Sequence, residues 1–310
     1  MTRRELVIPP ELAGERLDRA LAALLPDCSR TMIQKLIRNG MVELAGHGPA
    51  DSPRMTAAAD MRLAVSIPDP VAETPSPEPF AFPVLYEDDD MLVIDKPPHV
   101  VVHPAAGNAS GTVVNALLDR YPGMADALDE FDNRPGIVHR LDKDTSGILV
   151  IAKHAAAQAQ LSAAFAERKT AKTYLALVRG VPDFREKRVE LPIGRHPVSR
   201  QKMAVVTRGG KAAVSILRPV RSGRIGALPA SLLEVRILTG RTHQIRVHCS
   251  YLGYPVLGDA VYGGSAADAA PRQMLHAWKL AIPRPTTGEM LEFCAPPPSD
   301  MQSLIDTLCI

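Results

Sequence analysis

A proline-rich segment divides this chain of 310 residues into a short N-terminal part and a long C-terminal part. The segment covers residues 68–83, PDPVAETPSPEPFAFP, and holds six prolines in 16 residues. Proline lacks the backbone N–H that helices and sheet ladders need, and proline-rich segments act as semi-rigid spacers. The sequence therefore predicts a linker at 68–83 that separates two domains.

The N-terminal part has the pattern of a small α+β module over residues 12–67. Apolar residues recur at helical spacing over 17–25 and again over 32–37. Residues 41–44 and 61–67 have the apolar content of short strands. Two short helices and a small sheet resemble the S4 RNA-binding domain.

Three basic residues, Arg30, Lys35 and Arg38, fall on or beside the second predicted helix. The resemblance to S4 domains implies that they contact RNA phosphates, and the alternative is a solvated basic face. Residues 42–46 and 59–60 depart from the usual S4 sequence. The sequence therefore predicts the module but leaves open how strongly it binds RNA.

The C-terminal part is organised around residues 134–153, in which a dense polar cluster precedes an apolar run. The run, Ile148 to Ala152, is rich in β-branched residues and predicts a buried strand. The cluster spans residues 139–146, HRLDKDTS. Burying charged side chains costs free energy unless each is paired. The stretch is therefore either a functional site or a salt-bridged turn.

The nine residues from His139 to Gly147, HRLDKDTSG, resemble the signature of RNA pseudouridine synthases of the RluA/RluD type. The resemblance implies that Asp142 is the catalytic residue and that Arg140 fills the space left by a flipped base. The alternative interpretation is that His139 and Arg140 only brace the turn. Asp142 to Thr145 also fits the Asp-x-Asp-x-Thr pattern of Mg²⁺-dependent phosphotransferases, but that pattern follows an apolar strand, whereas here the strand comes after it.

Further segments between about residues 84 and 297 resemble motifs of the same family in the expected order. The resemblance implies that Tyr174 stands at the uracil pocket, that Arg246 pairs with the catalytic carboxylate, and that Leu275 lines the pocket. From the residues alone, Tyr174 fits an ordinary strand tyrosine and Leu275 a core leucine. The two histidines of GRTHQIRVH lie on different faces of a predicted helix, so zinc binding is not expected.

The sequence also indicates two further basic residues that are candidates for the site, and one residue at which a helix is expected to start. Lys96 lies in a turn, DKPP, where it either positions the active site or is simply solvated. Arg195 lies in a loop with other cations, Gly and Pro, which suits contact with phosphates and equally fits a solvated loop. Thr242 is predicted to be the N-cap of a helix that continues to Leu252.

Composition limits the function classes. The net charge is +2 and the pI is near 8.3, so RNA affinity must come from local basic patches. The four cysteines form no Cys-x-x-Cys pair, which disfavours structural zinc and suggests a reducing compartment. The sequence has no Walker motif or Rossmann fingerprint, and no metal or organic cofactor is expected. Without an apolar signal region or a run of 18 apolar residues, a cytoplasmic protein is expected.

These features together predict an α+β enzyme. An S4-like RNA-binding domain at 12–67 and a linker at 68–83 precede a pseudouridine synthase domain at 84–310, with a mixed, mainly antiparallel sheet flanked by helices and loops. The expected reaction is the isomerisation of uridine to pseudouridine in structured RNA, most closely large-subunit (23S) ribosomal RNA, free or in pre-ribosomal particles. Whether Asp142 attacks the sugar, attacks the base or assists glycal formation stays open. The alternative is a non-catalytic RNA-binding or RNA-chaperone protein on the same fold.

Overall fold

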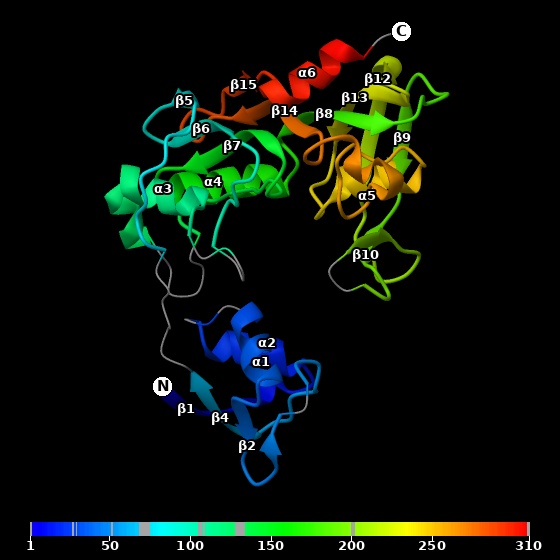
Figure 1. The fold of residues 1–310 in the computed structure, drawn as a ribbon. Coiled ribbons are helices and arrows are strands. Elements are labelled where there is room, and N and C mark those ends of the chain that lie inside the picture. Colours follow the sequence, from blue (N-terminus) through cyan, green and yellow to red (C-terminus); the bar gives the residue numbers. More distant parts are fainter. Residues whose placement is uncertain are drawn as a thin grey trace. The chain divides into compact units, whose positions relative to one another are not determined.

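The computed structural model describes residues 2–26, 28, 30–50, 52–67, 75–104, 108, 110–127, 134–199 and 202–308. The chain divides into two compact units (Figure 1), one of Met1–Thr74 with Leu128–Asn133 and one of Pro75–Ala127 with Arg134–Ile310. Of the predicted linker, residues 68–74 lie outside the described part of the chain, and residues 75–83 form neither helix nor strand.

The smaller unit is an antiparallel sheet of four strands in the order β1-β4-β2-β3, with two helices that share its core. Its elements are β1 (Thr2–Val7), η1 (Pro10–Leu12), α1 (Leu17–Leu24), α2 (Arg30–Arg38), β2 (Val42–Leu44), β3 (Gly48–Pro49) and β4 (Arg62–Ile67). Leu21 of α1, Ile33 of α2 and Val65 of β4 are fully buried in one apolar cluster. Strand β1 lies outside the module predicted at 12–67, because its mostly exposed side chains carry no apolar alternation.

The larger unit is built on a sheet of nine strands in the order β5-β6-β7-β14-β8-β13-β12-β9, with β15 paired to β14. Its strands are β5 (Val84–Glu87), β6 (Met91–Lys96), β7 (Ser146–Ala152), β8 (Ala171–Arg179), β9 (Lys187–Glu190), β12 (Val214–Ile225), β13 (Leu228–Ile237), β14 (Leu275–Pro283) and β15 (Met290–Cys294). Strands β7 and β14 pair in parallel, and the other pairs of this sheet are antiparallel. A separate hairpin pairs β10 (Ile193–Arg195) with β11 (Met203–Val205). The predicted mixed, mainly antiparallel sheet is confirmed.

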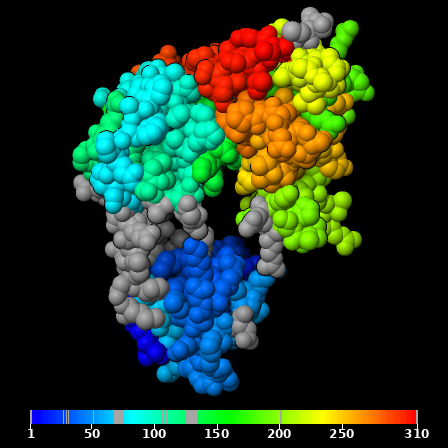
Figure 2. Space-filling model, viewed as in Figure 1, coloured from blue at the N-terminus to red at the C-terminus, as the bar shows by residue number. Residues whose placement is uncertain are grey.

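Helices pack on both faces of the central strand β8, because successive side chains of a strand point to opposite faces. Val178 lies in one apolar cluster with Cys249 of α5, and Leu177 lies in another with Met301 of α6. The helices of this unit are α3 (Val113–Arg120), η2 (Pro122–Ala127), α4 (Ala155–Ala166), α5 (Gln244–Tyr251), η3 (Gly264–Ala269) and α6 (Ser299–Thr307). Helix α6 lies at the surface of the unit, as Figure 2 shows. Strand β8 is therefore held from both sides.

The helix that was predicted to begin after Thr242 begins instead at Gln244, with His243 in the N-cap position. His243 has a left-handed backbone, with φ 55°, and its side chain does not cap the helix. The Gln244 side chain accepts hydrogen bonds from the Arg241 N–H and the Thr239 hydroxyl. The turn is thus closed by an amide inside the first turn of the helix, and the prediction of Thr242 as N-cap is wrong.

Candidate active site

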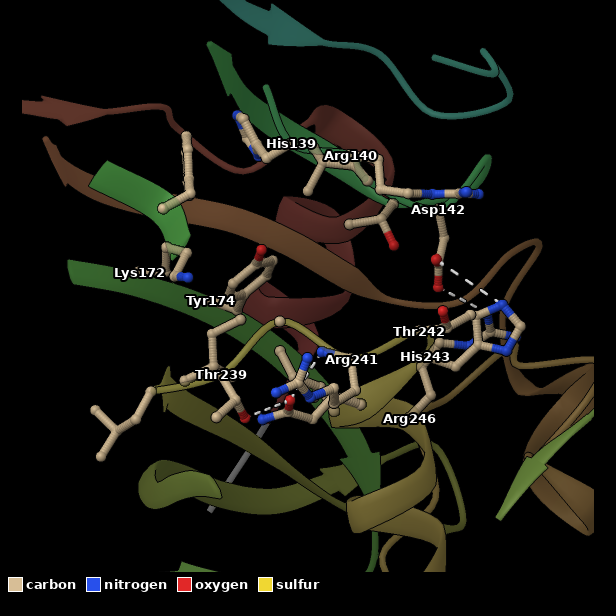
Figure 3. Close-up of a pocket in the computed structure, with 18 of the residues that line it drawn as sticks. His139, Arg140, Asp142, Lys172, Tyr174, Thr239, Arg241, Thr242, His243 and Arg246 are labelled. Carbon is tan, nitrogen blue, oxygen red and sulfur yellow. Dashed lines mark hydrogen bonds and ion pairs between the residues drawn. The ribbon is translucent and has the colours of Figure 1, made fainter. Parts of the chain in front are cut away.

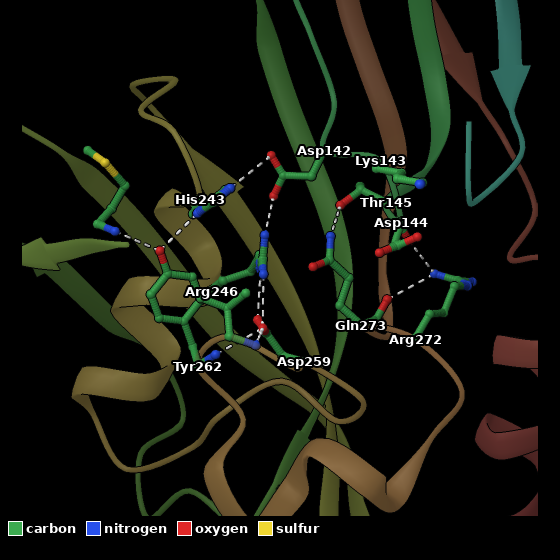
Figure 4. Close-up of polar contacts among 12 residues, drawn as sticks. Asp142, Lys143, Asp144, Thr145, His243, Arg246, Asp259, Tyr262, Arg272 and Gln273 are labelled. Carbon is green, nitrogen blue, oxygen red and sulfur yellow. Dashed lines mark hydrogen bonds and ion pairs between the residues drawn. The ribbon is translucent and has the colours of Figure 1, made fainter. Parts of the chain in front are cut away.

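Asp142 lies in the loop that leads into β7, and its side chain is 21% exposed. The loop is held by a side chain from the end of β6 and by two side chains just before β14, and the latter two are shown in Figure 4. The contacts are Lys96 Nζ to the Lys143 carbonyl at 3.1 Å, Arg272 Nη1 to the Asp144 carbonyl at 2.9 Å, and Gln273 Nε2 to the Thr145 hydroxyl at 2.8 Å. Asp142 is therefore fixed by contacts from segments far away in the sequence.

Lys96 is fully buried, so it is not the solvated turn lysine that the sequence left as an alternative. Its ammonium group donates hydrogen bonds to the carbonyls of Pro97, Val100 and Lys143. Burial lowers the pKa of Lys96 to about 7, and the nearby charge of Asp144 opposes that shift. Lys96 thus supports the loop that carries Asp142, and it does not line the cavity beside it.

Arg246 joins two carboxylates, those of Asp142 and Asp259 (Figure 4). Its Nη1 donates to Asp142 Oδ2 at 2.8 Å, while Nε and Nη2 form a bidentate pair with Asp259 at 2.7 and 2.9 Å. Burial alone would lower the pKa of Arg246, but the hydrogen bonds and charges of the two carboxylates raise it. The guanidinium therefore stays charged and fixes the orientation of Asp142.

Asp259 is a member of the site that the sequence did not indicate. Its side chain is fully buried. Burial raises its pKa, but the hydrogen bonds and charge of Arg246, with two backbone N–H groups of the following turn, outweigh burial and lower it. Asp259 follows Gly258, whose φ is 73° and where a Cβ would meet the Arg272 carbonyl oxygen at 1.8 Å. A required glycine before an aspartate is the only local signal for this position.

His243 faces the other carboxylate oxygen of Asp142 and was also not assigned from the sequence. Its Nε2 lies 3.9 Å from Asp142 Oδ1, and its Nδ1 lies 2.8 Å from the Tyr262 hydroxyl. Burial lowers the pKa of His243, and the charge of Asp142 opposes that shift. The two oxygens of Asp142 therefore have different environments, one bound by a cation and one near an imidazole.

These side chains border a cavity of about 470 Å³ (Figure 3). Six of the residues predicted for the site line it, namely His139, Arg140, Asp142, Tyr174, Arg246 and Leu275. Thr239, Arg241, His243 and Lys172 line it as well and were not predicted. Small-molecule pockets typically occupy about 300–1,000 Å³, so this cavity has the size to hold one nucleoside unit.

Tyr174 and Leu275 form part of the cavity wall from the neighbouring strands β8 and β14. Tyr174 is only partly exposed, and burial raises the pKa of its phenol, as does the charge of Asp142. A phenol with a raised pKa stays protonated at neutral pH, so it is a poor base. The position of Tyr174 suits stacking on a base and hydrogen-bond donation better than proton abstraction.

His139 and Arg140 lie side by side in the sequence but in different environments. His139 Nε2 accepts the N–H of Val150 at 2.8 Å, and its ring stacks on Phe165 with centroids 4.5 Å apart. Burial lowers the pKa of His139 to about 3, so the ring is neutral and braces the loop against β7. Arg140 is exposed where it lines the cavity (Figure 3). Both side chains line the cavity, and Arg140 is the more exposed of the two.

The other predicted site residues are not among those that line the cavity of the larger unit. Arg195 is exposed at the end of β10, and Arg30, Lys35 and Arg38 belong to α2 of the smaller unit. Within the described residues, no group of three or more His, Cys, Asp or Glu side chains could hold a metal ion. In the same part of the chain, no helix combines the length and apolar character that a membrane span requires.

Comparison with known proteins links this chain to a set of RNA-modifying enzymes. A family model described as RNA pseudouridylate synthase matches residues 90–251. The ribosomal large subunit pseudouridine synthase D of Zymomonas mobilis is 40% identical over 322 residues, which cover 100% of this chain and 99% of that protein. An uncharacterized RNA pseudouridine synthase of Chloroflexus aurantiacus is 44% identical over 306 residues, covering 98% and 93% of the two chains.

A solved structure, human RNA pseudouridylate synthase domain containing 1, matches with a TM-score of 0.58 and 34% identity. The match covers 71% of this chain and 86% of that chain. The segment matched by the family model, residues 90–251, contains Asp142, Tyr174 and Arg246. The residues that line the cavity, except Leu275, therefore lie inside the region matched by the family model.

Proposed function

This chain belongs to the RNA pseudouridylate synthase family, and we propose that it isomerises specific uridines of large-subunit ribosomal RNA to pseudouridine, with Asp142 as the catalytic residue. The observation that carries the proposal is the Asp142 carboxylate, which borders a cavity of nucleoside size and is held through one oxygen by a buried arginine. Relatives named for the large ribosomal subunit supply the class of RNA. We also propose a cytoplasmic location, because the proposed substrate is ribosomal RNA.

Mapping of pseudouridines in ribosomal RNA from cells with and without the gene tests this function. The expected result is the loss of a defined set of pseudouridines from the large-subunit RNA, restored by the intact gene. An unchanged map would contradict the proposed substrate. A map restored equally well by a variant without the Asp142 carboxylate would favour the alternative of a non-catalytic RNA-binding or RNA-chaperone protein.

The reaction needs an ionised carboxylate next to the ribose and the base, because the N1–C1′ bond breaks and the uracil rejoins through C5. Arg246 compensates the charge of Asp142 and leaves Oδ1 directed away from the guanidinium. The target base must leave its stack, at a cost of a few kcal/mol. Stacking on Tyr174 offsets roughly 1–3 kcal/mol of that cost. The exposed Arg140 can occupy the space that the base leaves in the RNA.

The smaller unit supports an additional proposal, that residues 12–67 form an S4-like RNA-binding domain and residues 84–310 a separate catalytic domain. Lys35 and Arg38 are exposed on α2. Arg30 and Arg16 both donate hydrogen bonds to the fully buried Asp18. Burial raises the pKa of Asp18, but the hydrogen bonds from Arg16, Gln34 and Arg30 outweigh it and lower the pKa to about 2. Two half-exposed guanidinium groups are thus held in fixed positions, as phosphate contacts require.

Replacing Lys35 and Arg38 together with alanine is expected to weaken RNA binding without slowing the chemical step. The slope of log K against log salt concentration falls in magnitude by about one for each phosphate contact that is lost. For the double variant this slope should therefore fall by about two. The half-saturating RNA concentration should rise about 3- to 10-fold at physiological salt, because the electrostatic contribution falls. Single-turnover rates across RNA and salt concentrations measure both quantities.

The matched control is Arg62→Ala, which removes an exposed cation from β4 of the same unit. This variant should keep the salt slope of the wild type. A double variant with an unchanged half-saturation point and a slower saturated rate would show that the small unit contributes to the chemistry, contrary to the proposal.

Catalysis is expected to survive the removal of divalent cations. The isomerisation is redox-neutral, and Arg246 rather than a metal ion compensates the charge of Asp142. The assay uses enzyme treated exhaustively with EDTA and an RNA that folds in monovalent salt. The rate should stay within about threefold of that of the untreated enzyme. Loss of a metal ion that acts as a Lewis acid would instead raise the barrier by several kcal/mol. Activity that is lost and returns only with added Mg²⁺ would favour the phosphotransferase interpretation of Asp142 to Thr145.

A further inference from the structure

A chain of hydrogen bonds favours the tautomer of His243 that carries the proton on Nε2. The Met203 backbone N–H can only donate, and it donates to the Tyr262 hydroxyl oxygen at 2.9 Å. The Tyr262 proton is then free to point at His243 Nδ1, 2.8 Å away (Figure 4). In this arrangement Nδ1 accepts the Tyr262 proton, and the neutral imidazole carries its own proton on Nε2. His243 therefore presents an N–H donor to the cavity.

This donor faces an acceptor at a distance that is too long for a direct bond. His243 Nε2 lies 3.9 Å from Asp142 Oδ1, whereas N–H···O hydrogen bonds span about 2.7–3.2 Å. The second oxygen, Oδ2, is already bound by Arg246. A single oxygen atom placed about 2.8 Å from both His243 Nε2 and Asp142 Oδ1 would satisfy both groups. That atom must accept from one neighbour and donate to the other.

A hydroxyl group is the ligand that meets this requirement. Water meets it too, but the cavity is lined to take a nucleoside unit, and an internal nucleotide of an RNA chain carries one free hydroxyl, the 2′-OH. The 2′-OH is both donor and acceptor, and proteins use it to distinguish RNA from DNA. The left-handed backbone of His243, with φ 55°, is an uncommon conformation for a residue other than glycine. Unusual backbone of this kind clusters at functional sites, although His99 shares it without lining the cavity.

We propose that His243 Nε2 and Asp142 Oδ1 together bind the 2′-hydroxyl of the target uridine, the imidazole donating to its oxygen and the carboxylate accepting its proton. The inference rests on the proposed function, since it assigns a contact within the same cavity. Tyr262 acts indirectly, because its hydroxyl sets the tautomer of His243 without reaching the substrate. Through this contact, His243 and Asp142 make the enzyme select ribose over deoxyribose at the flipped nucleotide.

The test is a double-mutant cycle between protein and RNA. His243→Gly removes the imidazole and accepts the left-handed backbone, and the RNA carries either 2′-OH or 2′-H at the target uridine. Removing the 2′-OH should slow the single-turnover kcat/KM of the wild type about 10- to 100-fold, because two polar groups lose their partner. The same RNA change should have about a 3- to 10-fold smaller effect on His243→Gly, because only Asp142 still contacts the 2′-OH in this variant. Intrinsic effects of the 2′-H sugar on the reaction are shared by both proteins and cancel in the cycle.

Tyr262→Phe is the second variant and keeps the ring that lies against Arg246. It removes the hydroxyl that holds the tautomer, so discrimination between the two sugars should fall about 3- to 10-fold below that of the wild type. If His243→Gly does not fold, as judged by its thermal melt, Tyr262→Phe decides the question alone. Unchanged discrimination in Tyr262→Phe would then overturn the proposal.

The controls separate this contact from general damage. His99 also has a left-handed backbone, with φ 69°, and does not line the cavity, so His99→Gly should keep the full discrimination of the wild type. An RNA with 2′-H at the nucleotide after the target should show no coupling to His243. Equal discrimination in wild type and His243→Gly, with an active wild-type enzyme, would overturn the inference and leave the proposed function intact. A wild-type enzyme that forms no pseudouridine would instead contradict the proposed function.

Discussion

Replacing Asp142 with asparagine is expected to abolish pseudouridine formation while RNA binding and folding stay close to those of the wild type. Asparagine has nearly the same shape and keeps an oxygen for Arg246 Nη1. It has no negative charge, so it cannot serve as the anionic group that the reaction requires. The single-turnover rate should fall at least about a thousandfold, as expected for the loss of a catalytic group. Filter binding of the same RNA should change by less than about threefold, since the phosphate contacts that dominate RNA affinity are not altered by this substitution.

The matched control is Asp144→Asn, two positions along the same loop. The Asp144 side chain is 39% exposed and contacts His99 rather than the cavity, while its backbone carbonyl anchors the loop. Its replacement should cost less than about tenfold in rate, since a partly exposed pair contributes little. If the Asp142→Asn enzyme keeps more than a few per cent of wild-type turnover, the substitution raises the activation free energy by about 1.5–2.5 kcal/mol at most. That result would show that Asp142 is not the catalytic residue.

The parts of the fold that the sequence predicted are those with strong local signals. The apolar run from Ile148 to Ala152 became the buried strand β7, and the polar cluster before it became the loop that holds Asp142. The alternation around Tyr174 predicted β8, whose two faces pack against different helices. In each case the spacing of apolar residues matches the period of the element, and tertiary contacts reinforce it.

The parts that the sequence did not predict depend on contacts between distant segments. Asp259 reaches the site from a turn after α5. Its carboxylate can be buried because it pairs with Arg246, and the spacing of apolar residues in the sequence does not predict such a pair. Lys96 ends β6 directly before a Pro-containing turn of a kind that is typically exposed, yet it is buried, and three backbone carbonyls compensate its burial. His243 was hidden for a related reason. The helix start depends on a glutamine amide and not on the threonine that the local pattern favoured.

Replacing Arg246 with methionine is expected to remove activity and also to destabilise the fold strongly at neutral pH. Asp259 is fully buried, and the change removes both of its guanidinium hydrogen bonds. Breaking a buried ion pair from one side costs about 3–5 kcal/mol, because the remaining charge is left without compensation. Denaturant unfolding at pH 7.5 measures this loss. The control Arg218→Met breaks an exposed pair with Glu234 and should cost less than about 1 kcal/mol.

The pH dependence of this loss has a definite sign. In the wild type, the pKa of Asp259 is held below its usual value, so the pair contributes stability above the unfolded pKa that is lost as pH falls through the folded pKa. In Arg246→Met, burial dominates and raises the pKa of Asp259, so the penalty is present at neutral pH and is relieved as pH falls. The difference in unfolding free energy between the two proteins should therefore be largest near pH 7.5 and narrow towards pH 4.

A second substitution separates the structural role of Arg246 from its role at Asp142. Arg246→Met combined with Asp259→Asn removes the buried charge, so it should recover about half or more of the lost stability at pH 7.5. It should not recover activity, because Asp142 still lacks the cation that orients its carboxylate. Recovery of both stability and turnover would mean that Arg246 acts only on the fold. The opposite result would be that the double variant recovers no stability and that the difference in unfolding free energy between wild type and Arg246→Met does not narrow towards pH 4. It would mean that Arg246 does not compensate the charge of Asp259.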